Sequence, residues 1–298
     1  MRLLVDSANI SSSDIVLEVG CGTGSLTEAI ASLAGKIIAV EIDSNLAKIA
    51  KKQLAGAKNV TVLNTDILKN KNTISQTVLQ SVARLTGHGS QEMRNERRAT
   101  RDEGRLLLVA NLPYNVASAV MINLVTGPIT GPPLCGNIDA MYVTVQKEVA
   151  DRMTAAPGSR DYGTLSILLN AIGNIQTIRT LKPTVFWPQP QVDSAMVSFI
   201  RKEEKAGRIR NIEIFSKTVR LFMQHRRKML KACVKFATGP LGEIGNWPQI
   251  FEQCSIDPSQ RGEQLSPENY IALANLCRRH IIPHQLSTGR ERKFSDGR

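Results

Sequence analysis

Short apolar runs, each with an acidic or amide side chain within or just after it, recur four times in the first 111 residues. They occupy residues 15–19, 37–40, 60–63 and 106–110. Such runs are typical of strands that are buried on both faces of a parallel sheet. The pattern predicts an α/β fold whose polar side chains gather at the carboxyl edge of the sheet, where ligands bind in open α/β sheets.

The fourth run leads into the tract Asn-Leu-Pro-Tyr-Asn at 111–115. Pro113 fixes its own φ and favours an extended backbone at Leu112, so the turn is stiff. It would present the Asn111 amide, the Leu112 carbonyl and the flat face of Tyr114 to one side. This set suits a planar, amine-bearing ring such as a nucleobase. The alternative is an ordinary strand-to-helix turn with Asn111 as a cap.

The first run continues into a glycine-rich turn, Gly-Cys-Gly-Thr-Gly at 20–24, and a helix expected at 25–34 and closed by Gly35. Glycines let the backbone approach a ligand closely, and the helix directs its N–H groups at that ligand. The spacing does not fit the dinucleotide fingerprint. With Glu18 ahead of it, the turn is similar to the first motif of S-adenosylmethionine-dependent methyltransferases, and the acid suits a ligand with a cationic amino group.

Two further acids follow the next two runs. Glu41, about 20 residues past the first glycine, stands where a carboxylate can accept both hydroxyls of a ribose; its alternative is an exposed charge at a strand end. Asp66 can accept a hydrogen bond from an adenine amino group, or it can cap a helix. The amphipathic helix expected at 44–54 would have one apolar face, formed by Leu46, Ile49, Ala50 and Leu54.

Composition excludes some classes of protein. No apolar run approaches the roughly 20 residues that span a bilayer, and no signal peptide is visible. The five cysteines are scattered without a CxxC pair, which favours reduced thiols in the cytoplasm and argues against a zinc site. We therefore expect a cytoplasmic protein with no metal and no membrane partner, and we expect it to be a monomer.

The formal charge of +12 is uneven, because residues 205–298 hold 17 basic and 8 acidic residues. Such an excess favours a polyanion such as nucleic acid. A long helix is expected at 214–236, and we assign its basic residues Arg226, Arg227 and Lys228 to phosphate contact. A solvated helix face is the alternative for these three.

These patterns predict two domains and a tail. A sheet domain would cover 1–203, with an insertion at about 70–104 whose arginines could contact RNA, although a solvated loop is the preferred interpretation. A helical, RNA-binding domain would cover 204–286. Residues 287–298 form a polar, disordered tail.

On these motifs the chain resembles the rRNA adenine N6,N6-dimethyltransferases of the KsgA type, which are related to the Erm resistance methylases. Besides the glycine turn, the acids that follow it and the tract at 111–115, further matching stretches run in family order over nearly the whole chain. They lie at 146–153, 157–165, 186–194, 226–228 and 266–273.

The resemblance implies a Rossmann-like S-adenosylmethionine-dependent methyltransferase domain with a small C-terminal helical domain. The family substrate is a pair of adjacent adenines in the 3′-terminal hairpin of small-subunit (16S) rRNA, dimethylated on N6 during ribosome maturation. Carried over by motif, Gly20 approaches the amino-acid part of the donor, Glu41 the ribose and Asp66 the adenine amine. Asn111 lines the junction with the target base. Phe186 is the candidate for the wall opposite Tyr114, with a core aromatic as the alternative.

One departure concerns the start of the chain. The family carries an N-terminal segment with a Gln-Asn-Phe-Leu motif that covers the donor, whereas Arg-Leu-Leu-Val at 2–5 resembles the end of the next helix. We therefore expect weakened donor binding and activity. Two other functions stay open: a non-catalytic nucleic-acid-binding or ribosome-assembly factor on this scaffold, and an Erm-like methylase of large-subunit rRNA.

Overall fold

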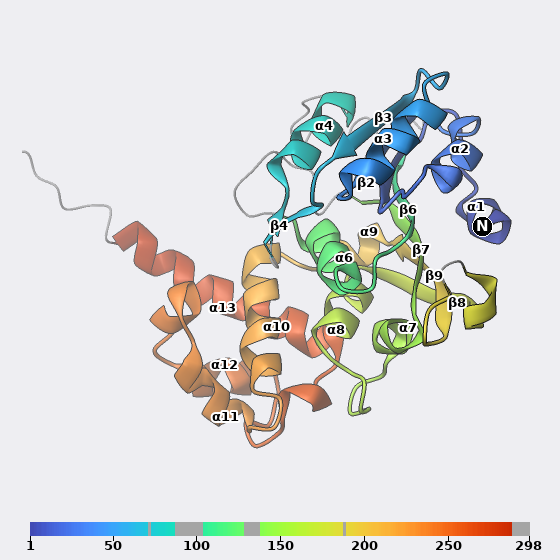
Figure 1. Cartoon of the computed structure of the whole chain (residues 1–298). Coiled ribbons are helices and arrows are strands. Elements are labelled where there is room, and N and C mark those ends of the chain that lie inside the picture. Colours follow the sequence, from blue (N-terminus) through green and yellow to red (C-terminus); the bar gives the residue numbers. More distant parts are fainter. Residues whose placement is uncertain (71–72, 87–103, 128–137, 187–188, 288–298) are drawn as a thin grey trace, which may run out of the picture. The chain divides into compact units, whose positions relative to one another are not determined.

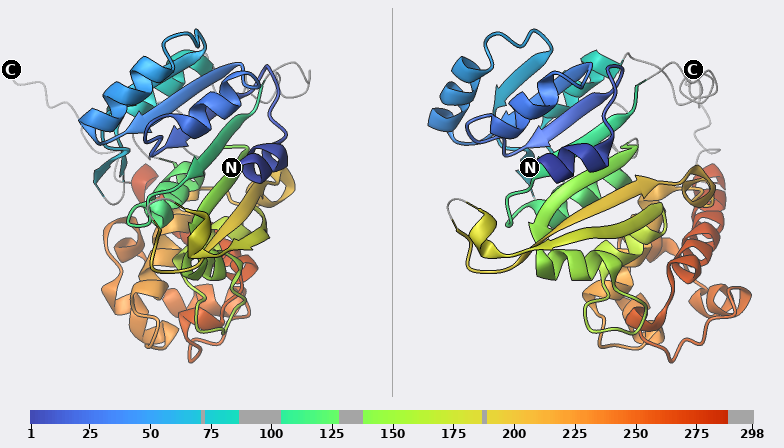
Figure 2. Two further views of the ribbon diagram at one scale, coloured as in Figure 1. Left: turned by 45° about the vertical axis from the view of Figure 1, so that its right-hand side comes forward. Right: turned by 90° about the vertical axis from the view of Figure 1, so that its right-hand side faces the viewer.

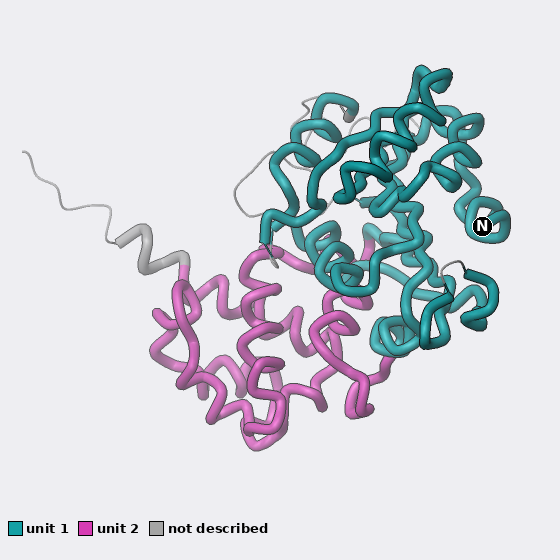
Figure 3. The backbone as a smooth tube through the Cα atoms, viewed as in Figure 1, with its two compact units in different colours: residues 1–154, 172–203 teal, residues 155–171, 204–298 magenta. Residues whose placement is uncertain are grey.

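The computed structural model describes residues 1–70, 73–86, 104–127, 138–186 and 189–287. The chain forms two compact units, one from residues 1–154 with 172–203 and one from 155–171 with 204–298 (Figure 3). The sequence places residues 155–171 in the sheet domain, but the structure groups them with the helical unit. Within that unit, helix α8 (Thr164–Asn170) contacts two later helices, and the Tyr162 hydroxyl donates to the Leu265 carbonyl at 2.9 Å.

The first unit contains a sheet of seven strands in the order β3-β2-β1-β6-β7-β9-β8 (Figures 1 and 2). The strands are β1 (Ile15–Val19), β2 (Lys36–Glu41), β3 (Val60–Asn64), β6 (Leu106–Asn111), β7 (Ala140–Gln146), β8 (Gly173–Leu181) and β9 (Ser194–Arg201). The first five are parallel, whereas β9 runs antiparallel to β7, and β8 antiparallel to β9. A separate short pair joins β4 (Leu68–Asn70) and β5 (Thr73–Ile74). The expectation of an α/β fold is confirmed.

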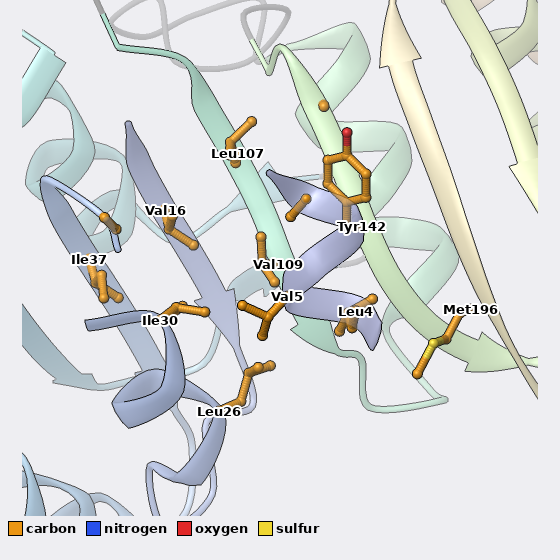
Figure 4. Packing of buried hydrophobic residues seen from close by; sticks show 13 residues of the cluster. Leu4, Val5, Val16, Leu26, Ile30, Ile37, Leu107, Val109, Tyr142 and Met196 are labelled. Atoms are coloured by element: carbon orange, nitrogen blue, oxygen red, sulfur yellow. The ribbon is translucent and has the colours of Figure 1, made fainter. Parts of the chain in front are cut away.

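In the described part of the first unit, six helices contact its strands. They are α1 (Arg2–Ala8), α2 (Ser25–Ala31), α3 (Ser44–Gln53), α4 (Gln76–Thr86), α6 (Ala117–Thr126) and α7 (Lys147–Thr154). Among them, α6 contacts β5 of the short pair. Leu4 of α1 and Ile30 of α2 lie in one buried cluster with Val16, Ile37 and Leu107 of three neighbouring strands (Figure 4). Successive residues of a strand point to opposite faces. The neighbours of these strand residues, such as Leu17, Ile38 and Leu108, are buried as well. Burial on both faces explains why β1, β2 and β6 are continuous apolar runs.

Two local expectations were wrong. Helix α2 ends at Ala31, and Gly35 is no helix cap. A Cβ on Gly35 would lie 2.4 Å from the Ser12 carbonyl oxygen, so glycine is needed there for close backbone packing.

On α3 the structure buries the short side chains Ala47 and Ala50. Of the face expected to be apolar, Leu46 and Ile49 are 36% and 49% exposed, whereas Ala50 and Leu54 are buried.

The sequence interpretation also missed β8. This strand pairs only with β9, at the edge of the sheet, and most of its side chains are not buried. Its pairing with β9 shifts between Thr177 and Arg179, as expected at a β-bulge. An irregular edge strand has neither an apolar run nor a clean alternation, which are the two sequence signals for a strand.

The second unit is helical and has an aromatic core. Besides α8 it contains α10 (Ile212–Gln224), α11 (Leu230–Cys233), α12 (Trp247–Gln253) and α13 (Pro267–Ser287), with 3₁₀ turns at Val234–Phe236, Gly239–Glu243 and Gly262–Gln264; α9 (Glu203–Ala206) begins at the unit boundary. Phe222 lies within 6.0–6.4 Å, ring centroid to centroid, of Trp247, Phe251 and Tyr270. Such aromatic clusters supply much of the apolar burial in a small unit.

The long helix expected at 214–236 is interrupted, and this expectation was wrong. Helix α10 ends at Gln224, and the next residues form a turn in which Lys228 N donates to the His225 carbonyl at 2.7 Å. Leu230 N then donates to the Gln260 carbonyl at 2.8 Å. Tertiary hydrogen bonds to a distant segment therefore override the local helical periodicity.

Parts of two other expectations lie outside the described residues. Of the insertion expected at 70–104, residues 73–86 form β5 and α4, whereas 71–72 and 87–103, with their arginines, are outside. The tail expected at 287–298 lies outside from residue 288 onward. None of the described helices has the length and apolar character needed to cross a membrane.

Candidate active site

The strand order places two loops beside each other at the carboxyl edge of the sheet. β1 pairs with β2 on one side and with β6 on the other. From β1 the chain first adds β2 and β3 on one side of the sheet. It then returns to the other side of β1 and adds β6 and β7 there. The loops that leave β1 and β6 flank this reversal of strand order, which is where open α/β sheets bind ligands.

The glycine turn after β1 has a left-handed backbone at three positions. Gly20, Gly22 and Gly24 have φ values of +75°, +57° and +93°, which L side chains rarely adopt. A Cβ on Gly20 would lie 2.9 Å from Cγ of Pro113 in the turn after β6, whereas one on Gly22 would meet no atom within 4 Å. The turn therefore packs against the second loop at Gly20 and faces open space at Gly22.

Glu41 is buried at the end of β2 and joins this glycine turn to the next helix. Its exposed fraction is only 6%. One carboxylate oxygen accepts from Gly22 N at 2.8 Å, and the other accepts from Asp43 N at 2.9 Å. The Asp43 side chain in turn caps α3. The alternative of an exposed charge at a strand end is therefore wrong, because the carboxylate is held in one orientation at the edge of the sheet.

Glu18 lies beneath the glycine turn and is also buried. Its carboxylate accepts from the Thr27 hydroxyl of α2 at 2.6 Å. Burial raises the pKa of Glu18 to about 7; the Thr27 hydrogen bond lowers it, and the negative charge of Glu41 raises it further. In this structure the partner of the acid is a helix hydroxyl, and the contact anchors α2 to β1.

Asp66 is exposed beyond the end of β3. One of its carboxylate oxygens accepts from Leu68 N at 2.9 Å, and the residues that follow form β4. The alternative of a helix cap is therefore wrong, since no helix starts there. The other oxygen has no hydrogen bond to the described part of the chain, so Asp66 keeps an acceptor beside the end of β3.

The tract after β6 is fixed by its backbone and leaves one amide free. Leu112 N donates to the Thr144 carbonyl of β7 at 3.0 Å, and the Pro113 carbonyl accepts from the first turn of α6. Asn111 is exposed, and neither its side chain nor the Leu112 carbonyl has a hydrogen bond within the described residues. Helix α6 has no side-chain cap. The alternative in which Asn111 caps that helix is therefore wrong.

Tyr114 is half-buried and is anchored through its hydroxyl. Its oxygen lies 3.0 Å from the hydroxyl oxygen of Ser194, the first residue of β9.

Phe186 follows the 3₁₀ turn Pro183–Val185 and is also half-buried. Among the described residues it makes no ring contact with another aromatic side chain, so nothing assigns it to an aromatic core.

The three basic residues of the second unit differ from one another. Arg226 donates to the Glu263 carboxylate at 2.8 Å and to the Arg160 carbonyl at 3.1 Å, and thus joins three segments. Arg227 is exposed, and Lys228 is exposed with its ammonium 5.2 Å from the centre of the Phe236 ring. They lie in the turn after α10, so the solvated helix face considered for them does not exist.

The structure assigns contacts to two polar residues that end matching stretches of sequence but received no role from the sequence. Thr27 anchors Glu18, and Ser194 anchors Tyr114. Both hydroxyls are fully buried, whereas serine and threonine are mostly exposed in proteins. Each has an apolar residue on one side and an acidic residue on the other, and this local pattern does not reveal the buried partner. Within the described residues no three His, Cys, Asp or Glu side chains form a group that could hold a metal ion.

Two solved structures share this fold. A dimethyladenosine transferase from Plasmodium falciparum aligns with a TM-score of 0.66 at 24% identity, over 94% of this chain and 95% of that chain. The 23S rRNA methyltransferase ErmE aligns with a TM-score of 0.55 at 20% identity, over 93% and 96% of the two chains. The two alignments show that the fold is a Rossmann-like one, with the glycine turn at the reversal of strand order.

The chain belongs to the ribosomal RNA adenine dimethylase family, whose sequence model matches residues 1–276. Two relatives are named Ribosomal RNA small subunit methyltransferase A. The protein from Geobacillus sp. (strain WCH70) is 32% identical over 95% of this chain and 88% of its own length. The one from Bacillus mycoides (strain KBAB4) is 33% identical over 96% and 88%. The expected family and the expected enzyme class, an rRNA adenine dimethyltransferase, are confirmed.

Proposed function

We propose that this protein uses S-adenosylmethionine to dimethylate the N6 amines of two adjacent adenines in the 3′-terminal hairpin of small-subunit rRNA during ribosome maturation. The names of its relatives support the small subunit as the substrate. The observation that carries the proposal is the contact of Gly20 with Pro113. It brings the glycine turn, which suits a donor, against the turn that presents Asn111.

The residues of the glycine turn and of β2 fit the donor. Open space above Gly22 lets a ligand reach the backbone. Glu41 uses one lone pair on each oxygen for backbone N–H groups, which leaves further acceptor capacity for two ribose hydroxyls. Gly20 would face the amino-acid part, and the free oxygen of Asp66 would accept from the adenine amine. The donor supplies a methyl group made electrophilic by its sulfonium.

Asn111 and Leu112 would orient the target amine. The exocyclic nitrogen of adenine is a weak nucleophile, because its lone pair is delocalised into the ring. The Asn111 side-chain oxygen and the Leu112 carbonyl would each accept one hydrogen from it. That favours a pyramidal nitrogen whose lone pair points at the methyl group. Attack of the nitrogen on the methyl group would leave a positively charged, ammonium-like nitrogen, which is acidic and loses its proton easily to solvent. Catalysis then rests on positioning and electrostatics rather than on a strong base.

Tyr114 would stack on the extruded adenine, with Phe186 as the opposite wall of the pocket. Base–aromatic stacking contributes about 1–3 kcal/mol per base, which offsets part of the cost of unstacking the target. In the second unit, the exposed Arg227 and Lys228 would contact phosphates. Arg226 contributes mainly by holding their turn in place, since its guanidinium is paired with Glu263.

The test is methyl transfer from radiolabelled S-adenosylmethionine to small ribosomal subunits that lack this modification. We expect label on the two adjacent adenines, and none on subunits already methylated. Label on large-subunit rRNA instead would favour the Erm-like alternative. No transfer to either subunit, together with binding to the small one, would favour a non-catalytic assembly factor.

A further inference from the structure

The buried hydroxyl of Ser194 and the half-buried ring of Tyr114 form a contact that the proposed function does not yet use. Ser194 is fully buried, and 80 residues separate it from Tyr114 in the chain. Their hydroxyl oxygens lie 3.0 Å apart, and either can be the donor. Buried hydroxyls need a hydrogen-bond partner, so each residue constrains the other.

Strand direction explains why this serine reaches the site. β6 and β9 are not neighbours, because β7 lies between them. β9 runs antiparallel to β7, so its first residue lies at the carboxyl end of β7, where Ser194 pairs with Gln146. The Tyr114–Ser194 contact therefore spans the end of β7.

Backbone hydrogen bonds make this edge rigid. Leu112 N donates to the Thr144 carbonyl at 3.0 Å, and Lys147 N donates to the Asp193 carbonyl at 2.9 Å. Leu112, two residues before Tyr114, is thus tied to β7, and Asp193, directly before Ser194, is tied to Lys147, which follows the end of β7. A tyrosine ring has two rotatable side-chain bonds, and a hydrogen bond at its far end restricts both.

We propose that Ser194 is a positioning residue for methyl transfer: its hydroxyl fixes the Tyr114 ring in the orientation that stacks the target adenine beside Asn111. The Tyr114 hydroxyl is then an anchor and takes no part in proton transfer. This inference rests on the proposed function, because it assigns a role to Tyr114 within it.

A double-mutant cycle with Tyr114→Phe and Ser194→Ala tests the inference. Tyr114→Phe keeps the stacking ring and removes only the anchor, so both single variants should lower kcat/KM for undermethylated small subunits by a similar factor, about 3–10-fold. The double variant should be no slower than the slower single one, because both partners are then apolar and no buried hydroxyl is left unpaired. The affinity for S-adenosylmethionine, measured by calorimetry, should not change.

Ser198→Ala is the matched control on the same strand. Ser198 is also buried, but its hydroxyl lies 3.5 Å from the Gln176 carbonyl rather than near Tyr114. This variant should turn over like the wild type. Equal losses in Ser198→Ala and Ser194→Ala would overturn the inference, since any buried serine of β9 would then have the same effect.

The pH profile of kcat separates anchoring from proton transfer. If the hydroxyl only anchors the ring, Tyr114→Phe has the same profile as the wild type at a lower level. Three outcomes would overturn the inference: multiplicative losses in the double variant, an altered pH profile of Tyr114→Phe, or full activity of Ser194→Ala. With an active wild type, each of them would leave the proposed function intact. A wild type without methyl transfer would overturn both.

Discussion

Gly20 of the turn after β1 packs directly against Pro113 of the turn after β6: a Cβ on Gly20 would come within 2.9 Å of the proline Cγ. The proline ring is rigid and cannot turn aside. Gly20 also has a φ of +75°, so backbone conformation and space both require glycine there. This contact sets the spacing between the two loops that form the candidate active site.

Gly20→Ala should therefore destabilise the protein more than Gly22→Ala does. Both positions have a positive φ, which costs an L side chain about 1–2 kcal/mol. Only the Cβ on Gly20 would also collide with Pro113, and such overpacking adds about 1–3 kcal/mol. Free energies of unfolding from urea titrations would measure the difference. Equal losses for the two variants would show that the contact with Pro113 is not tight.

Asn111→Ala should abolish methyl transfer. Loss of one preorganised polar group at a reacting atom typically lowers kcat by about 10²–10³-fold, whereas the donor should still bind through the glycine turn and Glu41. Single-turnover methylation and donor calorimetry would measure the two effects separately. Asn115→Ala is the control, because Asn115 is an exposed amide of the same tract. Wild-type turnover in Asn111→Ala would refute the role of this amide.

Glu18 should make the stability of the protein depend on pH. Its pKa is raised from 4.5 to about 7 in the folded state, so the folded protein binds this proton more tightly than the unfolded chain does. The resulting stabilisation is fully present below pH 4.5 and is lost as the pH rises to about 7.

Glu18→Gln removes this dependence. Relative to that variant, the free energy of unfolding of the wild type should fall by about 3 kcal/mol across this pH range. Urea titrations at both ends of the range would measure it. Glu28→Gln, at an exposed carboxylate of α2, controls for the change in net charge. Parallel pH profiles for the wild type and Glu18→Gln would contradict the raised pKa.

Arg226 and Arg227 should differ in what their loss affects. Arg226→Ala removes a partly exposed ion pair with Glu263 and should lower stability by up to about 1 kcal/mol. Arg227→Ala should leave stability unchanged and reduce the slope of log K for RNA binding against log salt by about one. Thermal melting and binding titrations at several salt concentrations would measure the two effects. A loss of stability in Arg227→Ala together with a smaller salt slope in Arg226→Ala would contradict the prediction. It would make Arg226 the phosphate contact and Arg227 the structural residue.

The sequence alone determined the central part of the sheet and most of its polar edge. The apolar runs of β1, β2 and β6 are unambiguous, because these strands are buried on both faces and have no polar face to interrupt them. Parallel strands end at one edge, so the glycine turn, Glu41 and Asn111 could be expected there from their order in the chain. These inferences needed only local pattern and the direction of parallel strands.

Tertiary structure alone decided the edge strand β8, the end of α10 at Gln224 and the contact of Tyr114 with Ser194. β8 is stabilised by its pairing with β9 rather than by an apolar run of its own, and the turn after α10 is held by residues near 260. Ser194 reaches Tyr114 because β9 runs antiparallel in an otherwise parallel neighbourhood. Each of these depends on hydrogen bonds between residues far apart in the chain, and local periodicity contains no information about such partners.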